Sequence, residues 1–232
     1  MIVSHKHRFI FLKTRKTAST STELVLFPHC GDGDIITPLT PTDLTRRYGH
    51  RARNHLRSTF PFDPRPLIHR FRPVEGSRSI DFHDHIHARD VRSYVGEKIW
   101  NSYFKFSFER NIYDRQVSWY HYRTKKPEHA RKWPDFRTFL MRSPRAKIDN
   151  FLIYTIEGRP VVDFMGRYET LEPDLRAVMK LIGLPEPAEM PFAKGEIRPR
   201  RERSYRDYYD DETKALVESW YPGERELFGD VF

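Results

Sequence analysis

Residues 9–23 read "FIFLKTRKTASTSTE", and this stretch decides the fold. The apolar run 9–12 is typical of a buried strand, and the small residues 17–22 lead into an apolar segment, 23–26, that favours a helix. A helix amino terminus carries unsatisfied N–H donors and about half a positive charge. Strand, polar turn and helix in this order therefore form a phosphate-binding layout.

The strand-then-helix order occurs twice more along the chain. Alternating phenylalanines at 104–108 predict a strand, and the spacing of Tyr113, Val117 and Tyr120 predicts a helix after it. A strand at 161–165 precedes a helix that Gly183 is placed to end. Shorter helices are expected at 86–96 and from about 210, and residues 28–80 are expected to be mostly loops. We therefore predict an α/β fold in three layers, with a mainly parallel sheet flanked by helices, as one domain over residues 1–232.

Charge and composition limit the classes of binding partner that we expect. Lys and Arg number 41 against 32 Asp and Glu, a net charge of +9, so the protein is expected to attract anions. The cations are spread along the chain and the aromatics have core-like spacing, which argues against a nucleic-acid partner. No window approaches the roughly 18 apolar residues of a membrane span, and the single cysteine gives no internal disulfide. We expect a soluble, cytoplasmic protein.

The first motif, "RKTASTS", combines a cation with free donors. Lys16 supplies the charge, the backbone amides from Thr17 to Thr20 open onto the helix terminus, and hydroxyls follow at 17 and 19–21. The motif is not a GxxxxGK[ST] loop, because it lacks glycine and its lysine precedes the small residues, so ordinary nucleotide kinases are disfavoured. The alternative interpretation is a Ser/Thr-rich helix cap beside two solvated cations.

A second motif, "RNIYDRQVS", spans residues 110–118. Arg110 closes a strand, and Ser118 lies two turns into the following helix. A guanidinium holds a phosphate by two parallel bonds, and the hydroxyl can assist if that phosphate lies beside the helix. The two motifs together predict two phosphate sites.

This pair of motifs resembles the two cofactor signatures of PAPS-dependent sulfotransferases, in the carbohydrate (heparan/chondroitin-like) branch. That branch reads close to PKTGGTS and RNPYDRLVS, and the later blocks "FKFSFERN", "GRYETLEPDL" and "YYDDETKALVESWYPGERELFG" agree in order and spacing. The resemblance covers most of the chain and is weakest at 28–80. It implies a P-loop-like sulfotransferase fold and the donor 3′-phosphoadenosine 5′-phosphosulfate (PAPS), released as 3′-phosphoadenosine 5′-phosphate (PAP).

The resemblance also assigns roles to residues. Lys16 would lie beside the 5′-phosphosulfate, and Arg110 and Ser118 would hold the 3′-phosphate. The segment "KGEIRPRRERSYR" looks like the loop that closes over the nucleotide, although its arginines also fit a solvated basic face. The residues expected to wrap the phosphosulfate are Thr17, Ala18, Ser19, Thr20 and Ser21, and those expected in the closing loop are Lys194, Arg198 and Tyr205.

Three departures from the branch pattern stand out. Arg15 replaces the usual proline, Ala18 replaces a glycine, and Ile112 replaces the proline of the second motif. Ala18 limits close approach of the backbone to a phosphate, and Ile112 loses a fixed φ at the helix start. None of the three removes a charged ligand.

Sulfuryl transfer needs a base near the acceptor hydroxyl, and a neutral histidine suits this task near pH 7. The segment "FHDHIHA" offers His83, His85 and His87, which would share one face if it were extended. Similar sulfotransferases carry a histidine three residues before the alanine that begins a comparable helix, which implies His85 as the base, with His87 and His83 as lesser candidates. A metal site and a polar loop with surface histidines are the alternatives.

Other residues carry weaker expectations. Trp133 is a candidate platform for a sugar ring, Asp114 a candidate helix cap, and Glu109 a candidate second carboxylate in the site. The leading hypothesis is in-line transfer of a sulfuryl group to a hydroxyl of a carbohydrate or glycoconjugate acceptor, and the alternative is a nucleotide-dependent phosphotransferase that uses the same strand–loop–helix site.

Overall fold

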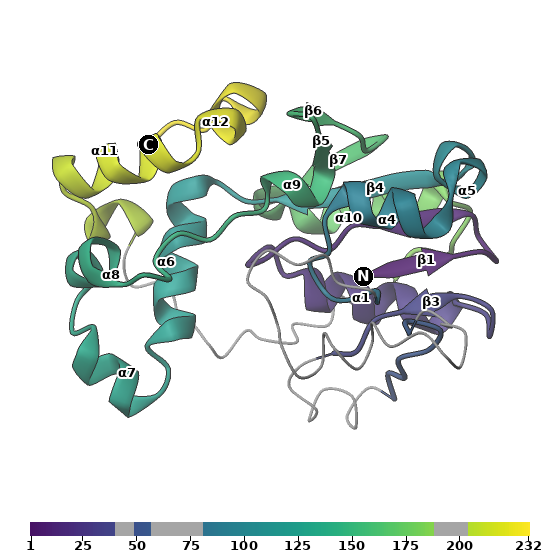
Figure 1. The fold of residues 1–232 in the computed structure, drawn as a ribbon, viewed down its shortest axis with the longest axis horizontal. Helices are drawn as coiled ribbons and strands as arrows, with labels where there is room; N and C mark the ends of the chain where they lie inside the picture. The colour runs from purple at the N-terminus through teal and green to yellow at the C-terminus, as the bar shows by residue number, and fades with distance from the viewer. Residues whose placement is uncertain (40–48, 57–80, 188–203) are drawn as a thin grey trace, which may run out of the picture.

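A computed structural model describes residues 1–39, 49–56, 81–187 and 204–232 (Figure 1). Its main sheet has five strands in the order β3-β1-β2-β4-β7. The strands are β1 (Ile2–Ser4), β2 (Phe9–Phe11), β3 (Ile35–Ile36), β4 (Phe104–Glu109) and β7 (Phe164–Arg167). β2, β4 and β7 are parallel, whereas β1 runs antiparallel to both β2 and β3.

The sheet is therefore mixed, and the expectation of a mainly parallel sheet was wrong for its amino-terminal half. Only residues 5–8 separate β1 from β2. Parallel neighbours need a crossover of a dozen or more residues, so this short connection can close only an antiparallel hairpin.

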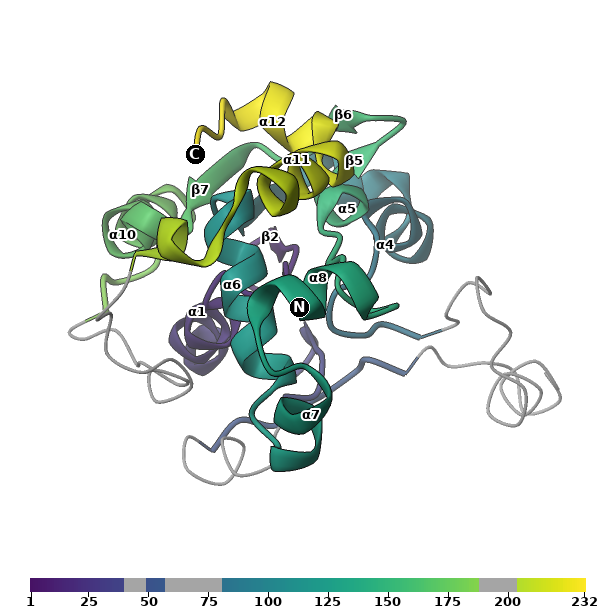
Figure 2. The same ribbon diagram turned by 90° about the vertical axis from the view of Figure 1, so that its left-hand side faces the viewer.

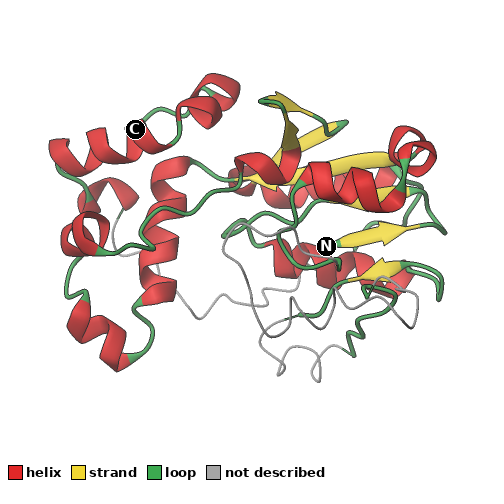
Figure 3. Ribbon diagram, in the orientation of Figure 1, coloured by secondary structure: helices red, strands yellow, loops and turns green. Residues whose placement is uncertain are grey.

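Helices cover both faces of the sheet, which confirms the α/β class and the three layers (Figure 3). On one face, α1 (Ser19–Leu26) and α10 (Leu171–Leu181) pack against alternate side chains of β2 and β4. The other face of the sheet, which includes Ile10, is covered by three helices. They are α4 (Ala88–Val95), α5 (Glu97–Ser102) and α9 (Phe151–Tyr154). The period of two within β2 divides its side chains between these two cores.

The remaining helices form a helical lobe beyond one end of the sheet (Figure 1). We define it by α6 (Ile112–Arg123), α7 (Pro127–Lys132), α8 (Phe136–Arg142), α11 (Asp211–Trp220) and α12 (Pro222–Phe228). Shorter elements are η1 (Phe27–His29), η2 (Tyr168–Thr170), η4 (Tyr205–Tyr208) and the hairpin β5 (Thr155–Ile156) with β6 (Arg159–Pro160). No helix in the described ranges is long and apolar enough to cross a bilayer.

Local signals placed most elements correctly. The predicted strand at 104–108 is β4, the helix after it is α6, and Asp210 caps α11 through the amide of Thr213. Gly183, with φ +70°, follows α10 as expected. The third predicted strand begins at Phe164 rather than 161.

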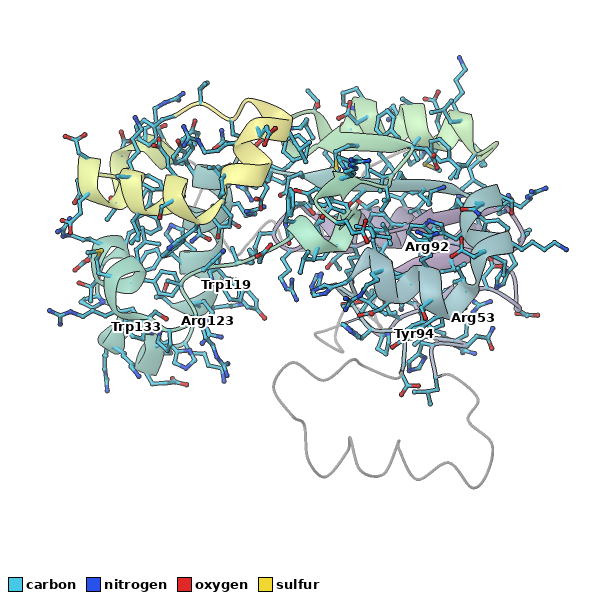
Figure 4. All side chains as sticks on the ribbon, turned by 45° about the horizontal axis from the view of Figure 1, so that its top comes forward. Arg53, Arg92, Tyr94, Trp119, Arg123 and Trp133 are labelled. Atoms are coloured by element: carbon cyan, nitrogen blue, oxygen red, sulfur yellow. The ribbon has the colours of Figure 1, made fainter. Side chains whose placement is uncertain are left out.

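Trp133 is not a sugar platform. Its side chain is 8% exposed and packs in the aromatic core of the helical lobe, where its ring meets Phe139 edge-on. In Figure 4, Trp133 lies on the helical lobe with Trp119 and Arg123. The other labelled residues, Arg53, Arg92 and Tyr94, lie on the part of the molecule that contains the sheet.

Gly166 tests the packing between β4 and β7. A Cβ added there lies 2.5 Å from Cδ1 of Phe108, a fully buried ring. We expect Gly166→Ala to lower the free energy of unfolding by about 1–3 kcal/mol, because the ring must leave its position. Gly33→Ala is the matched control, since its Cβ meets nothing within 4 Å. Equal urea midpoints for the two variants contradict this account of the sheet.

Candidate functional site

The loop between β2 and α1 carries three cations, and the first of them is internal. Lys13 is 2% exposed, and its Nζ lies 2.5 Å from Glu23 and 2.8 Å from Asp84. Burial disfavours the charge, but the two carboxylates outweigh it and raise the pKa of Lys13. Because this charge is neutralised inside the protein, Lys13 offers nothing to a ligand.

A buried side-chain amide holds the loop in place. The backbone N–H of Arg15 donates to Asn150 Oδ1 at 2.9 Å, and Asn150 Nδ2 donates to the Arg15 carbonyl at 3.0 Å. Nδ2 also lies 3.2 Å from Oε1 of Glu109, a fully buried carboxylate that accepts the Arg110 amide and pairs with Arg115 at 2.9 Å. Glu109 is thus a structural anchor for the loop and not a second carboxylate open to a ligand.

The loop backbone turns sharply before α1. Lys16 and Ala18 have φ of 64° and 55°, in the left-handed region that glycine adopts most easily. Ala18 is also the residue before the helix, and no side chain caps the first turn. The amides of Thr17, Ala18, Ser19 and Thr20 have no acceptor among the described residues. The helix start is therefore open to an anion.

Two hydroxyls of the motif are used inside the loop. Thr14 donates to the Phe108 carbonyl at 2.5 Å, so the 2.8 Å contact between Thr14 and Thr17 must use the proton of Thr17. Ser19 donates to the Thr14 carbonyl at 2.8 Å. Thr17 and Ser19 therefore present backbone amides to a ligand, rather than the hydroxyl donors that we expected.

Arg110 lies beside this loop, at the start of α6. Its Nε and Nη2 donate to Asp114 at 2.9 and 2.6 Å, and its Nη1 donates to the Lys16 carbonyl at 3.1 Å. The Tyr168 ring lies 3.9 Å from the guanidinium carbon. Asp114 is therefore the partner of Arg110, and our expectation that it caps the helix was wrong: Asn111 accepts the amides that a cap must satisfy.

One face of α6 connects the two motifs. Asp114, Ser118 and Tyr122 follow at intervals of four residues, so they share that face. Nζ of Lys16 lies 4.5 Å from the centre of the Tyr122 ring. Arg110 donates to the Lys16 carbonyl, and Lys16 contacts the face of α6 that carries Ser118. Figure 2 shows that α6 lies beside α1.

His85 lies behind the loop, in a turn with φ 60°. Its Nδ1 donates to the Lys13 carbonyl at 2.8 Å, so Nε2 of the neutral ring carries the lone pair. Burial, followed by the positive charge of Arg15, lowers the pKa of His85 to about 3. The ring is therefore neutral at pH 7 and oriented to accept a proton at Nε2.

The other two histidines differ from His85. His83 is exposed, whereas His87 is half-buried and burial is the main cause that lowers its pKa. The turn at His85 breaks the extended geometry that would have placed all three on one face. Within the described ranges, no three His, Cys, Asp or Glu side chains are grouped to hold a metal.

Of the expected closing-loop residues, Lys194 and Arg198 lie outside the described residues. Tyr205 begins η4 and stacks on Tyr113 of α6 at 6.4 Å with the planes 7° apart. It therefore lies at the same end of α6 as Arg110.

Sequence reasoning missed Asn150 and Tyr122. Asn150 follows an irregular stretch without periodicity, and its role depends on a contact 135 residues away. Tyr122 had a usable signal, since it lies four residues after Ser118 on a predicted helix.

Asn150→Ala is expected to lower the free energy of unfolding by about 1–3 kcal/mol, because it leaves the backbone N–H and carbonyl of Arg15 without partners and removes one of the donors to Glu109. Asn101→Ala is the control, since Asn101 is exposed and makes one 3.4 Å bond to Glu97. Urea unfolding at pH 7 measures both. A loss no larger for Asn150 than for Asn101 shows that the clamp does not fix the loop.

The low pKa of His85 predicts a pH-dependent stability. As pH falls from about 6.5 towards 3, the unfolded chain binds a proton at this residue that the folded chain does not, so stability is lost. His85→Asn removes this titration, and asparagine tolerates the left-handed φ. From pH 7 to pH 5 the wild type should lose roughly 2 kcal/mol more than the variant in urea titrations. Parallel losses would mean that His85 protonates normally when folded.

Comparison with known proteins relates the chain to an archaeal protein. No protein-family profile and no solved structure matches the chain. An uncharacterized protein of Archaeoglobus fulgidus is 39% identical over 99 residues, which cover 41% of this chain and 81% of the relative. The chain therefore belongs to the same family as this archaeal protein.

Proposed function

We propose that the protein is a PAPS-dependent sulfotransferase with a P-loop-like sulfotransferase fold, and that its acceptor is a hydroxyl of a carbohydrate or glycoconjugate. The observation that carries the proposal is the joint position of the two motifs. Lys16 and the open start of α1 lie on the same side of α6 as Arg110 and Ser118. One nucleotide with phosphates at both the 5′ and 3′ positions would contact both groups.

The 5′-phosphosulfate is assigned to Lys16 and the start of α1. The Lys16 cation and the amides of residues 17–20, which have no acceptor among the described residues, would stabilise the negative charge that develops on the bridging oxygen as it leaves. The reaction needs no covalent intermediate on the protein. The acceptor oxygen bonds to sulfur while the bond from sulfur to the 5′-phosphate oxygen breaks, and PAP departs.

The 3′-phosphate is assigned to Arg110 and Ser118. Asp114 and the Lys16 carbonyl use three of the five N–H groups of Arg110, which leaves two for a ligand. The guanidinium is 4% exposed, so a phosphate reaches it when one of these contacts opens. Ser118 is partly exposed on the same helix face.

We assign His85 as the base that accepts the proton of the acceptor hydroxyl. Its Nδ1–H is held by the Lys13 carbonyl, so Nε2 receives the proton of the hydroxyl during transfer. A low pKa keeps the lone pair available at neutral pH but also weakens the base. The hydroxyl becomes acidic as its oxygen shares an electron pair with sulfur, so the proton passes to Nε2 while the new O–S bond forms.

Nucleotide selectivity tests the cofactor assignment. In calorimetric titrations without metal, PAP is expected to bind at least ten-fold tighter than AMP or ADP, because only PAP has a 3′-phosphate. Ser118→Ala should weaken PAP several-fold and leave AMP unchanged, and Lys16→Ala should weaken both. Lys98→Ala, at an exposed site on α5, controls for lost charge. Equal affinity for PAP and AMP contradicts the assignment, and Mg²⁺-dependent use of ATP would favour a phosphotransferase.

A second test separates chemistry from binding. His85→Asn should reduce transfer of ³⁵S from labelled PAPS to a glycan mixture by about 10²–10⁴-fold, while PAP affinity stays within two-fold. His83→Asn, which alters an exposed histidine two residues away, should retain transfer. If PAP affinity falls together with transfer in the His85 variant, His85 belongs to the nucleotide site and is not the base.

A further inference from the structure

Arg15 differs from the other well-buried arginines. The guanidinium groups of Arg110 and Arg115 are 4% and 0% exposed, and each forms ion pairs with carboxylates within 3.1 Å. Arg15 is only partly exposed, and burial lowers its pKa. Yet it makes no ion pair within 4 Å with any carboxylate of the described chain, and its Nη1 donates only to the Asp149 carbonyl, at 2.8 Å.

One edge of this guanidinium is available to a ligand. Nε and Nη2 of Arg15 donate to no described residue, and neither is among the fully buried atoms that lack a partner. This edge is therefore in contact with solvent. Two adjacent N–H groups in one plane match two oxygens of a carboxylate or a sulfate ester.

Arg15 lies on the histidine side of the loop. His85 Nδ1 donates to the carbonyl of Lys13, two residues before Arg15, and after burial the charge of Arg15 contributes to the lowered pKa of His85. Its own backbone is clamped on both sides by Asn150, so its Cα position is fixed. Lys16, the next residue, instead points to Tyr122 on α6. The side chains of Arg15 and Lys16 thus lie on different sides of the loop.

After burial, the negative charge of Asp149 opposes the lowering of the Arg15 pKa, but its carboxylate forms no ion pair with Arg15 within 4 Å. A partly desolvated cation without a direct ion pair is unfavourable unless an anion completes it. We propose that Arg15 determines acceptor specificity by binding an anionic group, a carboxylate or a sulfate ester, that the acceptor carries near the hydroxyl facing His85. The inference rests on the proposed function for the identity of the acceptor site. The anion contact itself requires only the free edge of Arg15.

The test compares three probes that differ at one substituent: methyl β-D-glucoside, methyl β-D-glucuronide and methyl β-D-glucoside 6-sulfate. Binding to the nucleotide-free protein is followed by NMR titration. We expect the wild type to bind at least one charged probe ten-fold or more tighter than the neutral probe, and the stronger charged probe identifies the anion. Arg15→Gln should reduce this ratio to below two, and Arg15→Lys should keep part of it.

Arg142→Gln is the control, because it removes one positive charge from an exposed position on α8. It should leave the ratio unchanged. A wild-type ratio near one, or an equal loss in Arg142→Gln and Arg15→Gln, overturns the proposal. The outcome is separate from that of the PAP titration: a chain that ignores PAP but discriminates the probes through Arg15 keeps this anion site and loses the sulfotransferase assignment.

Discussion

The buried carboxylate of Glu109 is the contact on which the rest of the site depends. It stands at the end of β4 and receives the amide of Arg110, the side chain of Asn150 and the guanidinium of Arg115. These contacts connect the central sheet to the loop before α1 and to the helical lobe. A buried charge is costly unless it is paired and hydrogen-bonded, so the groups that surround Glu109 are held in one arrangement.

The loop between β2 and α1 shows how burial gives different roles to similar residues. Lys13 is internal and neutralised by two carboxylates, Arg15 donates to the Asp149 carbonyl, and Lys16 lies over an aromatic ring of α6. All three are cations within four positions of the sequence. Only the turn made by the left-handed residues and the Asn150 clamp separates their directions.

Much of the fold was predictable because its signals are local. Alternation gave β4, helical spacing gave α6 and α10, and a capping aspartate gave the start of α11. The hairpin of β1 and β2 was missed, since Ile2–Ser4 is too short for a periodic pattern. In the candidate site, motif spacing and the family resemblance singled out Lys16, Arg110 and Ser118, and the structure brings Lys16 and Arg110 into contact. The pairing of Asp114 with Arg110 follows i,i+4 spacing, whereas the Asn150 clamp depends on a contact 135 residues away that spacing does not encode.

The division of labour in the loop also restricts how its length can vary. The assignment of each cation follows from its count along the backbone after β2, and the clamp grips the backbone of one particular residue. Inserting or deleting a single residue between Lys13 and Arg15 would shift every later cation by one position. Lys13 would keep its buried carboxylates, but Arg15 would leave the Asn150 clamp and Lys16 would turn away from α6. Relatives that share this architecture should therefore tolerate substitutions in the loop far better than changes in its length.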